Sequence, residues 1–188
     1  LLNTSDIPYI LEEDGTYRYN SYETRAFSNA QVNFVAEALQ FADKETPREW
    51  AALFLSHIPL DTTNDSGYRF GITDALISGS PYMLAVINAY QKGTAFAAEG
   101  TDYNLSKGDI PEDFYVSVDV DYSINGTGTV LGFISGHTHT DNFSRSVGYE
   151  NSLSYGYPFL SLFGENTFAN FVVNREEKKI SVVSYGKT

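Results

Sequence analysis

The sequence predicts an α+β fold in which two packed β-sheets are flanked by helices. Two segments of the first half carry apolar residues at helical spacing, and from residue 115 onward the chain reads mostly as strands and turns. Hydrophobic residues make up 42% of the 188 residues and aromatic residues 15%, which is typical of a folded, aromatic-rich globular protein. We therefore expect one domain, or a large part of one.

The first helix is predicted over residues 27–44, FSNAQVNFVAEALQFADK. Ser28 and Gln31 form a capping-box pattern, which satisfies amides that have no partner at the start of a helix. The apolar side chains expected to face the core recur at helical spacing, which places them on one face of the helix. They are Val32, Val35, Leu39 and Ala42.

The second helix is predicted from Pro81 to Lys92. Ser80 would be its N-cap and Pro81 its first helical residue, where the missing amide hydrogen costs nothing. Gly93 would end the helix, because glycine readily takes the left-handed conformation found there.

Strand patterns lie between and after the helices. The apolar run WAALFLS at residues 50–56 suits a strand buried on both faces, and TVLGFIS at residues 129–135 is similar. Near the C-terminus, FANFVVN and ISVVSY flank the polar REEKK and predict a hairpin.

Residues 115–123 alternate strictly between apolar and polar side chains, which predicts a half-exposed strand. Its valines would be buried. A calcium loop needs glycine and glutamate at set positions, so we interpret the neighbouring carboxylates as a solvated strand face, formed by Asp113, Asp119 and Asp121.

The charge of the chain bears on its partners and its location. The formal net charge of −12 with scattered basic residues disfavours binding to nucleic acid or to an anionic membrane. Cysteine is absent, which excludes disulfides and thiol chemistry within these residues. No apolar segment reaches the roughly 18 residues of a membrane span. We expect a soluble protein, cytoplasmic or secreted after removal of an N-terminal segment.

The three histidines share one setting, since each comes after an apolar strand pattern and opens a polar loop. His57 follows ALFLS, while His137 and His139 follow LGFIS. If the two strands are neighbours in one sheet, all three imidazoles gather at one edge. Neutral imidazole is the commonest metal ligand, and a His-x-His pair at a strand end can serve two metals about 3.5–4 Å apart.

With LFLSHIP followed some eighty residues later by GFISGHTH, the chain resembles the last two signature blocks of the calcineurin-like metallophosphoesterases. The resemblance implies the C-terminal part of a two-sheet β-sandwich with flanking helices, and it makes residues 1–188 the C-terminal portion of a single such domain. It also implies a binuclear centre of divalent ions (Mn, Fe or Zn), whose bound hydroxide attacks the phosphorus of a phosphoester substrate.

The resemblance assigns a role to each histidine. His57 and His137 would bind the second metal, and His139 would bind the first. Asp61 and Asp141, which follow the two blocks, could orient an imidazole or contact substrate, although a turn-capping role is the commoner one for such aspartates.

The earlier blocks of the family are not present in this sequence. They supply an Asp-x-His pair, a bridging aspartate and an Asn-His pair, and no histidine precedes His57. The simplest interpretation is the C-terminal part of a longer enzyme. Because hard and borderline ions need carboxylates as well as imidazoles, we expect weak or partial metal binding and no appreciable phosphoester hydrolysis by this chain alone.

The alternative to a hydrolase is a noncatalytic, aromatic-rich β-domain that binds carbohydrate or a partner protein. The stretch YENSLSYGYPF at residues 149–159 would be suited to it, although ordinary sandwich core and turn is the favoured interpretation of these residues. A sandwich that lacks its first strands would also expose sheet edges and apolar surface, so we expect self-association of the chain.

Overall fold

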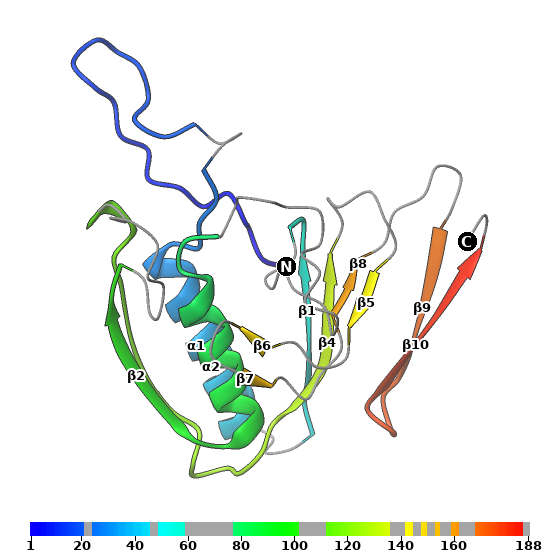
Figure 1. Cartoon of the computed structure of the whole chain (residues 1–188). Coiled ribbons are helices and arrows are strands. Elements are labelled where there is room, and N and C mark those ends of the chain that lie inside the picture. The colour runs from blue at the N-terminus through cyan, green and yellow to red at the C-terminus, as the bar shows by residue number, and fades with distance from the viewer. Residues whose placement is uncertain are drawn as a thin grey trace. The chain divides into compact units, whose positions relative to one another are not determined.

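The computed structural model describes residues 1–20, 24–45, 49–58, 77–101, 112–135, 142–144, 148–149, 153–154, 159–161 and 168–185. Helices and several small sheets occur together in this part of the chain, so the α+β prediction is confirmed (Figure 1). The chain divides into two compact units. The sheet unit comprises Leu1–Leu2, Ala51–Thr73 and Thr129–Thr188, and the helical unit comprises Asn3–Trp50 and Asp74–Gly128.

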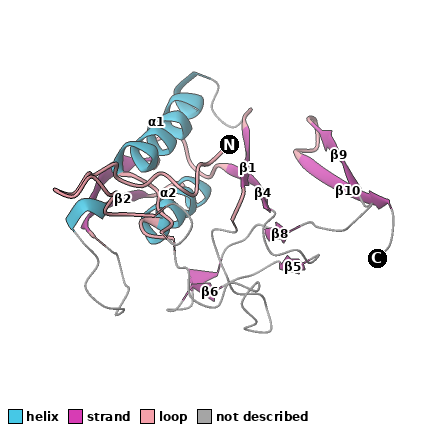
Figure 2. Cartoon of the chain, turned by 90° about the horizontal axis from the view of Figure 1, so that it is seen from above, coloured by secondary structure: helices cyan, strands magenta, loops and turns pink. Residues whose placement is uncertain are grey.

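The helical unit contains helices α1 (Asn29–Glu45) and α2 (Ser80–Lys92), the short 3₁₀ helix η1 (Glu112–Phe114), and strands β2 (Ala95–Gly100) and β3 (Val116–Asp121). Strands β2 and β3 pair antiparallel into a curved ribbon. The two helices pack against each other and against this ribbon, as Figures 1 and 2 show.

Helix α1 begins where the capping pattern predicts. The hydroxyl of Ser28 accepts a 3.1 Å hydrogen bond from the amide of Gln31, which is half of a capping box. The other half is replaced, because the amide and the hydroxyl of Ser28 both donate to the carboxylate of Asp6. The Gln31 side chain instead bonds the backbone of Asn3, with distances of 2.7 and 2.9 Å. The helix start therefore fixes the N-terminal segment beside it.

The predicted inner face of α1 is largely confirmed. Val32, Val35 and Leu39 are buried, and the side chain of Ala42 lies outside the described residues. On α2 every residue from Ser80 to Tyr90 is buried, so this is a core helix and not an amphipathic surface helix.

The predicted N-cap of α2 is wrong by one residue. Gly79 is the N-cap, in the left-handed conformation with φ 78°, and Ser80 is already helical and buried. A Cβ on residue 79 would lie 2.6 Å from the carbonyl oxygen of Phe27, so the close approach of two segments decides the cap. The predicted end is confirmed, since Gly93 caps the helix with φ 63°.

Strand β3 has the predicted alternation. Its valines are buried against the helices, while Ser117, Asp119 and Asp121 are exposed. Directly after the strand, the buried hydroxyl of Tyr122 donates a 3.0 Å hydrogen bond to the carbonyl of Ala36 in α1. The sheet end and the middle of the helix are thereby joined.

The sheet unit is built from strands β1 (Ala51–Ser56), β4 (Thr129–Ser135), β5 (Asn142–Ser144) and β8 (Phe159–Ser161), paired in the order β1-β4-β8-β5. Strands β1, β4 and β8 run parallel, and β5 is antiparallel to β8. On the other edge of β1, Leu2 forms an isolated parallel bridge to Ser56.

Two further strand pairs belong to this unit. Strands β6 (Gly148–Tyr149) and β7 (Leu153–Ser154) pair antiparallel, and β9 (Phe168–Asn174) and β10 (Lys179–Tyr185) form the predicted C-terminal hairpin. No helix within the described residues is long and apolar enough to cross a membrane.

Candidate metal centre

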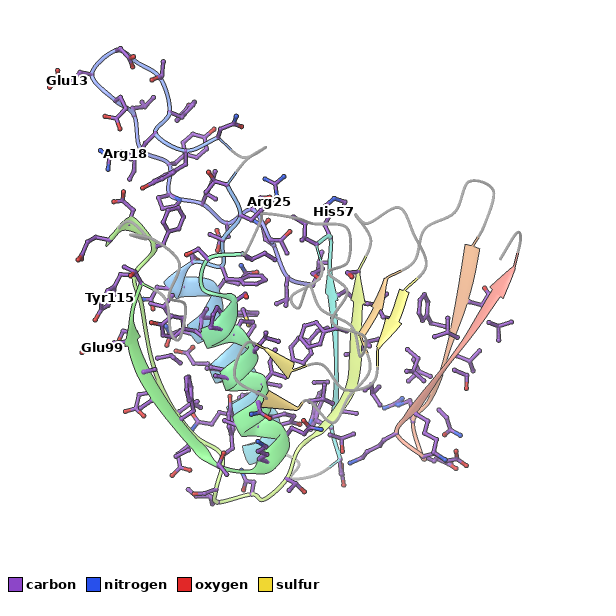
Figure 3. All side chains as sticks on the ribbon, viewed as in Figure 1. Glu13, Arg18, Arg25, His57, Glu99 and Tyr115 are labelled. Carbon is purple, nitrogen blue, oxygen red and sulfur yellow. The ribbon has the colours of Figure 1, made fainter. Side chains whose placement is uncertain are left out.

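His57 lies directly beyond the last residue of β1, as Figure 3 shows. Its two neighbours are buried, and Ile58 is only 1% exposed. The hydroxyl of Ser56 donates a 2.7 Å hydrogen bond to the carbonyl of Ile58, spanning the histidine. His57 itself is exposed. The chain at the end of β1 is thus fixed on both sides of a histidine that solvent can reach.

Strands β1 and β4 are parallel neighbours, which is the condition that the histidine hypothesis requires. Phe54 pairs with Phe133, and their rings stack with centroids 4.8 Å apart and planes 14° from parallel. Two residues later, Ser56 pairs with Ser135. Both strands therefore end in register at the same edge of the sheet, where His57 follows one strand and Gly136-His137 follows the other in the sequence.

A bulge in β4 sets this register. Ala52 pairs with Val130 but Leu53 pairs with Gly132, which leaves Leu131 as an extra residue. Gly132 has φ 147°, a conformation that favours glycine. Without the extra residue Ser56 would stand opposite Ile134, and the two strand ends would be offset by one residue.

Strand β1 is not buried on both faces as predicted. Phe54 and Ser56 are buried on one face, but Leu55 on the opposite face is 38% exposed. Side chains alternate between the faces of a strand, and the described part of the chain leaves the Leu55 face partly open. The apolar run therefore forms the predicted strand with one covered face.

Four of the predicted site residues lie outside the described residues, namely His137, His139, Asp61 and Asp141. Among the residues that are described, no group of three or more His, Cys, Asp or Glu side chains is arranged to hold a metal ion. The structure thus places His57 and the two strand ends.

The acidic run is more varied than predicted. Asp119 and Asp121 lie on the solvated face of β3, as expected, and Asp121 accepts a 2.8 Å bond from the amide of Ser123. Asp113 is not part of this face, since it lies in η1 and accepts hydrogen bonds from Tyr19 (2.8 Å) and Arg18 (3.0 Å). The Tyr19 hydroxyl and the Arg18 guanidinium lower the pKa of Asp113. The reason is tertiary, because both donors come from a segment some 95 residues earlier.

A pocket that the sequence did not suggest occurs in the helical unit. It has a volume of about 260 Å³ and is lined by Ile7, Tyr9, Tyr17, Tyr19 and Asn20. The signal was present in YRYN, because Tyr17 and Tyr19 are two residues apart and lie on one side of an extended chain. Tyr9 lines the pocket as well, but only because the chain reverses between Tyr9 and Tyr17, which the sequence pattern does not show.

Comparison with models of known protein families finds no match, and no protein of curated function and no solved structure is significantly similar to the chain.

Proposed function

We propose that this chain carries the C-terminal part of the binuclear metal centre of a calcineurin-like metallophosphoesterase, folded as part of a two-sheet sandwich. The observation that supports it is the register of β1 and β4, whose last partners are Ser56 and Ser135. In a parallel pair the carboxyl ends share one edge, so the strands that lead into SHIP and GHTH end at adjacent positions.

In this proposal His57 and His137 share one divalent ion, and His139 serves the other. Three neutral imidazoles are suitable donors for borderline ions such as Zn²⁺, but they are too few for two ions. When bound, the metals would supply a nucleophilic hydroxide and neutralise the phosphoryl oxygens. Because the chain itself carries a net charge of −12, its attraction for an anionic phosphoester would depend on those ions.

The exposed position of His57 fits a ligand role. A ligand must reach an ion that enters from solvent, and the Ser56 to Ile58 hydrogen bond limits the freedom of the segment that carries it. Limiting that freedom lowers the entropy lost when the ion binds. The carboxylates that would complete both sites belong to blocks that these residues do not contain.

Metal titration tests the proposal. Zn²⁺ added to the 188-residue chain should shift the imidazole NMR signals of the histidines and bind weakly, with no more than one ion held per chain at micromolar concentration. The variants His57→Ala and His137→Ala should each weaken binding about tenfold or more. Asp119→Asn, an exposed carboxylate on β3, is the matched control and should change nothing.

Two results would overturn the proposal. If Zn²⁺ leaves the histidine signals unchanged, or if His57→Ala binds it as the parent chain does, these strand ends do not form a metal site, and the noncatalytic binding domain becomes the better interpretation. Turnover of a nitrophenyl phosphate ester with two ions bound per chain would show that no further blocks are needed, against the partial site proposed.

A further inference from the structure

The tyrosine pocket lies in an arm of the helical unit that we define as residues 7–20. The arm reverses at Gly15, which has φ 83°, and its two sides are joined by backbone hydrogen bonds. Leu11 and Tyr17 form an antiparallel bridge, and the amide of Arg18 donates to the carbonyl of Ile10 at 2.9 Å. This pairing brings Tyr9 beside Tyr17, although they are eight residues apart.

The rings of the pocket are arranged as tilted walls. The centroids of Tyr9 and Tyr17 are 4.5 Å apart, and their planes meet at 59°. Tyr9 is 81% exposed and Tyr17 52% exposed, so much aromatic surface faces solvent. Such exposure costs free energy unless a ligand covers it.

Tyr19 is the fixed wall of the pocket. Its ring lies 4.7 Å from that of Phe114 in an edge-to-face contact, and its hydroxyl donates to Asp113. Hydrogen bonding to a carboxylate increases the electron density of the phenol ring. The face of an aromatic ring is negative, so this contact strengthens its attraction for a cation.

Charge around the pocket is also complementary to a cation. Glu12, Glu13 and Asp14 form the turn of the arm, with Glu13 at its tip in Figure 3. The nearby positive charge of Arg18 is already paired, at 2.6 Å with Glu12 and at 3.0 Å with Asp113. The local field is therefore negative, like the net charge of −12.

We propose that the tyrosine pocket binds a quaternary ammonium group, such as the trimethylammonium group of choline. The volume of about 260 Å³ is below the usual range for drug-sized ligands, which suits a compact group. None of its five lining residues is a carboxylate, so a primary ammonium would lose more hydration than the pocket returns. A trimethylammonium group has no N–H donors to satisfy and presents methyl groups to the rings.

Titration of the full chain with choline tests this proposal, followed by the NMR signals of the tyrosine rings. We expect a Kd on the order of 1 mM, because the site is exposed and a cation over a ring contributes modestly there. The neutral analogue 3,3-dimethyl-1-butanol has the same shape without the charge and should bind at least threefold more weakly. Equal binding of the two compounds would overturn the proposal, since it would show an apolar pocket only.

Substitutions distinguish the contribution of the aromatic rings to choline binding from any effect on the fold. Tyr9→Leu keeps apolar volume but removes the ring, and it should weaken choline binding roughly threefold to fivefold. Tyr17→Phe keeps the ring and should bind choline within twofold of the parent chain. Tyr115→Leu is the matched control, because this exposed tyrosine directly follows η1 and does not line the pocket, and it should leave the affinity unchanged.

Competing ligands define the source of the group. The same trimethylammonium group is present in free choline, in Nε-trimethyllysine and in phosphatidylcholine vesicles. The one of these three that binds with the highest affinity identifies the source. A neutral monosaccharide that binds better than choline would overturn the proposal in favour of carbohydrate recognition. The test is independent of the metal site, because choline does not coordinate metal ions and the variants lie in the helical unit.

Discussion

Ser56 and Ser135 are the last register partners of two parallel strands, and both side chains are buried. The two serines fix the point at which the polar loops of the SHIP and GHTH blocks begin. Because neighbouring strands lie about 4.8 Å apart, the two strands end side by side.

Gly132→Val should disturb the register of β4. A β-branched residue at φ 147° is strained, so we expect a loss of about 1–3 kcal/mol in the free energy of unfolding, measured by urea denaturation. Zn²⁺ binding should weaken as well. Gly15→Ala is the control, with a positive φ but open space around it in the arm, and it should leave Zn²⁺ binding intact. Unchanged stability of Gly132→Val would show that the bulge does not set the register.

Ser56→Ala should loosen the segment that carries His57. The variant removes the 2.7 Å hydrogen bond to the buried Ile58 carbonyl, which should cost about 1–2 kcal/mol of stability. The affinity for Zn²⁺, measured by calorimetry, should also decrease. Ser117→Ala on the exposed face of β3 should be within about 0.5 kcal/mol of the parent. A Ser56→Ala chain with full stability and affinity would contradict a positioning role.

Tyr122→Phe should destabilise the helical unit by about 1 kcal/mol, because it removes the buried hydrogen bond to Ala36 but keeps the ring beside Tyr90. Thermal or urea unfolding measures the loss. Tyr115→Phe removes an exposed hydrogen bond to Glu99 and should cost less than about 0.5 kcal/mol. Equal losses for the two variants would argue against burial as the cause.

Acid should release the arm from η1. The pKa of Asp113 is lowered from its ordinary 3.8 by the hydroxyl of Tyr19 and by Arg18. A lowered pKa means that the carboxylate stabilises the folded arm above pH 3.8, and this stabilisation is lost as the pH falls through the folded value. The ring signals of Tyr19 should therefore change below pH 4. In Asp113→Asn that step should disappear, and its persistence would assign the titration to another group.

The β9–β10 hairpin should mediate self-association. Phe171, Val173 and Val182 share one face by register, and all three are exposed. Apolar surface of this kind is stabilised by contact with a second copy. Val182→Lys should shift the chain toward monomer in sedimentation experiments. Val183→Lys, on the more polar opposite face, should have a smaller effect, and a monomeric parent chain at high concentration would contradict the prediction.

Among the described elements, the sequence by itself determined both α-helices, strands β1, β3 and β4, and the C-terminal hairpin. Helical spacing and Ser28 located α1, strict alternation located β3, and apolar runs located β1 and β4, because each signal is local to one segment. It did not reveal β2, whose residues AFAAEG are poor strand formers and pair only because β3 lies beside them. It also placed the N-cap of α2 at Ser80, since the approach of Phe27 to Gly79 is not visible in sequence.

The tertiary structure decided which of these elements meet. The histidine motifs predicted a shared sheet edge only on condition that β1 and β4 are neighbours, and strand pairing joins residues about eighty positions apart. The bulge at Leu131 and Gly132 then sets the register to within one residue. Likewise, the sequence alone predicted that Asp113 is a solvated carboxylate. In the structure the arm places Arg18 and Tyr19 within hydrogen-bonding distance of it. Local patterns specify elements, whereas long-range packing and hydrogen bonding choose their partners.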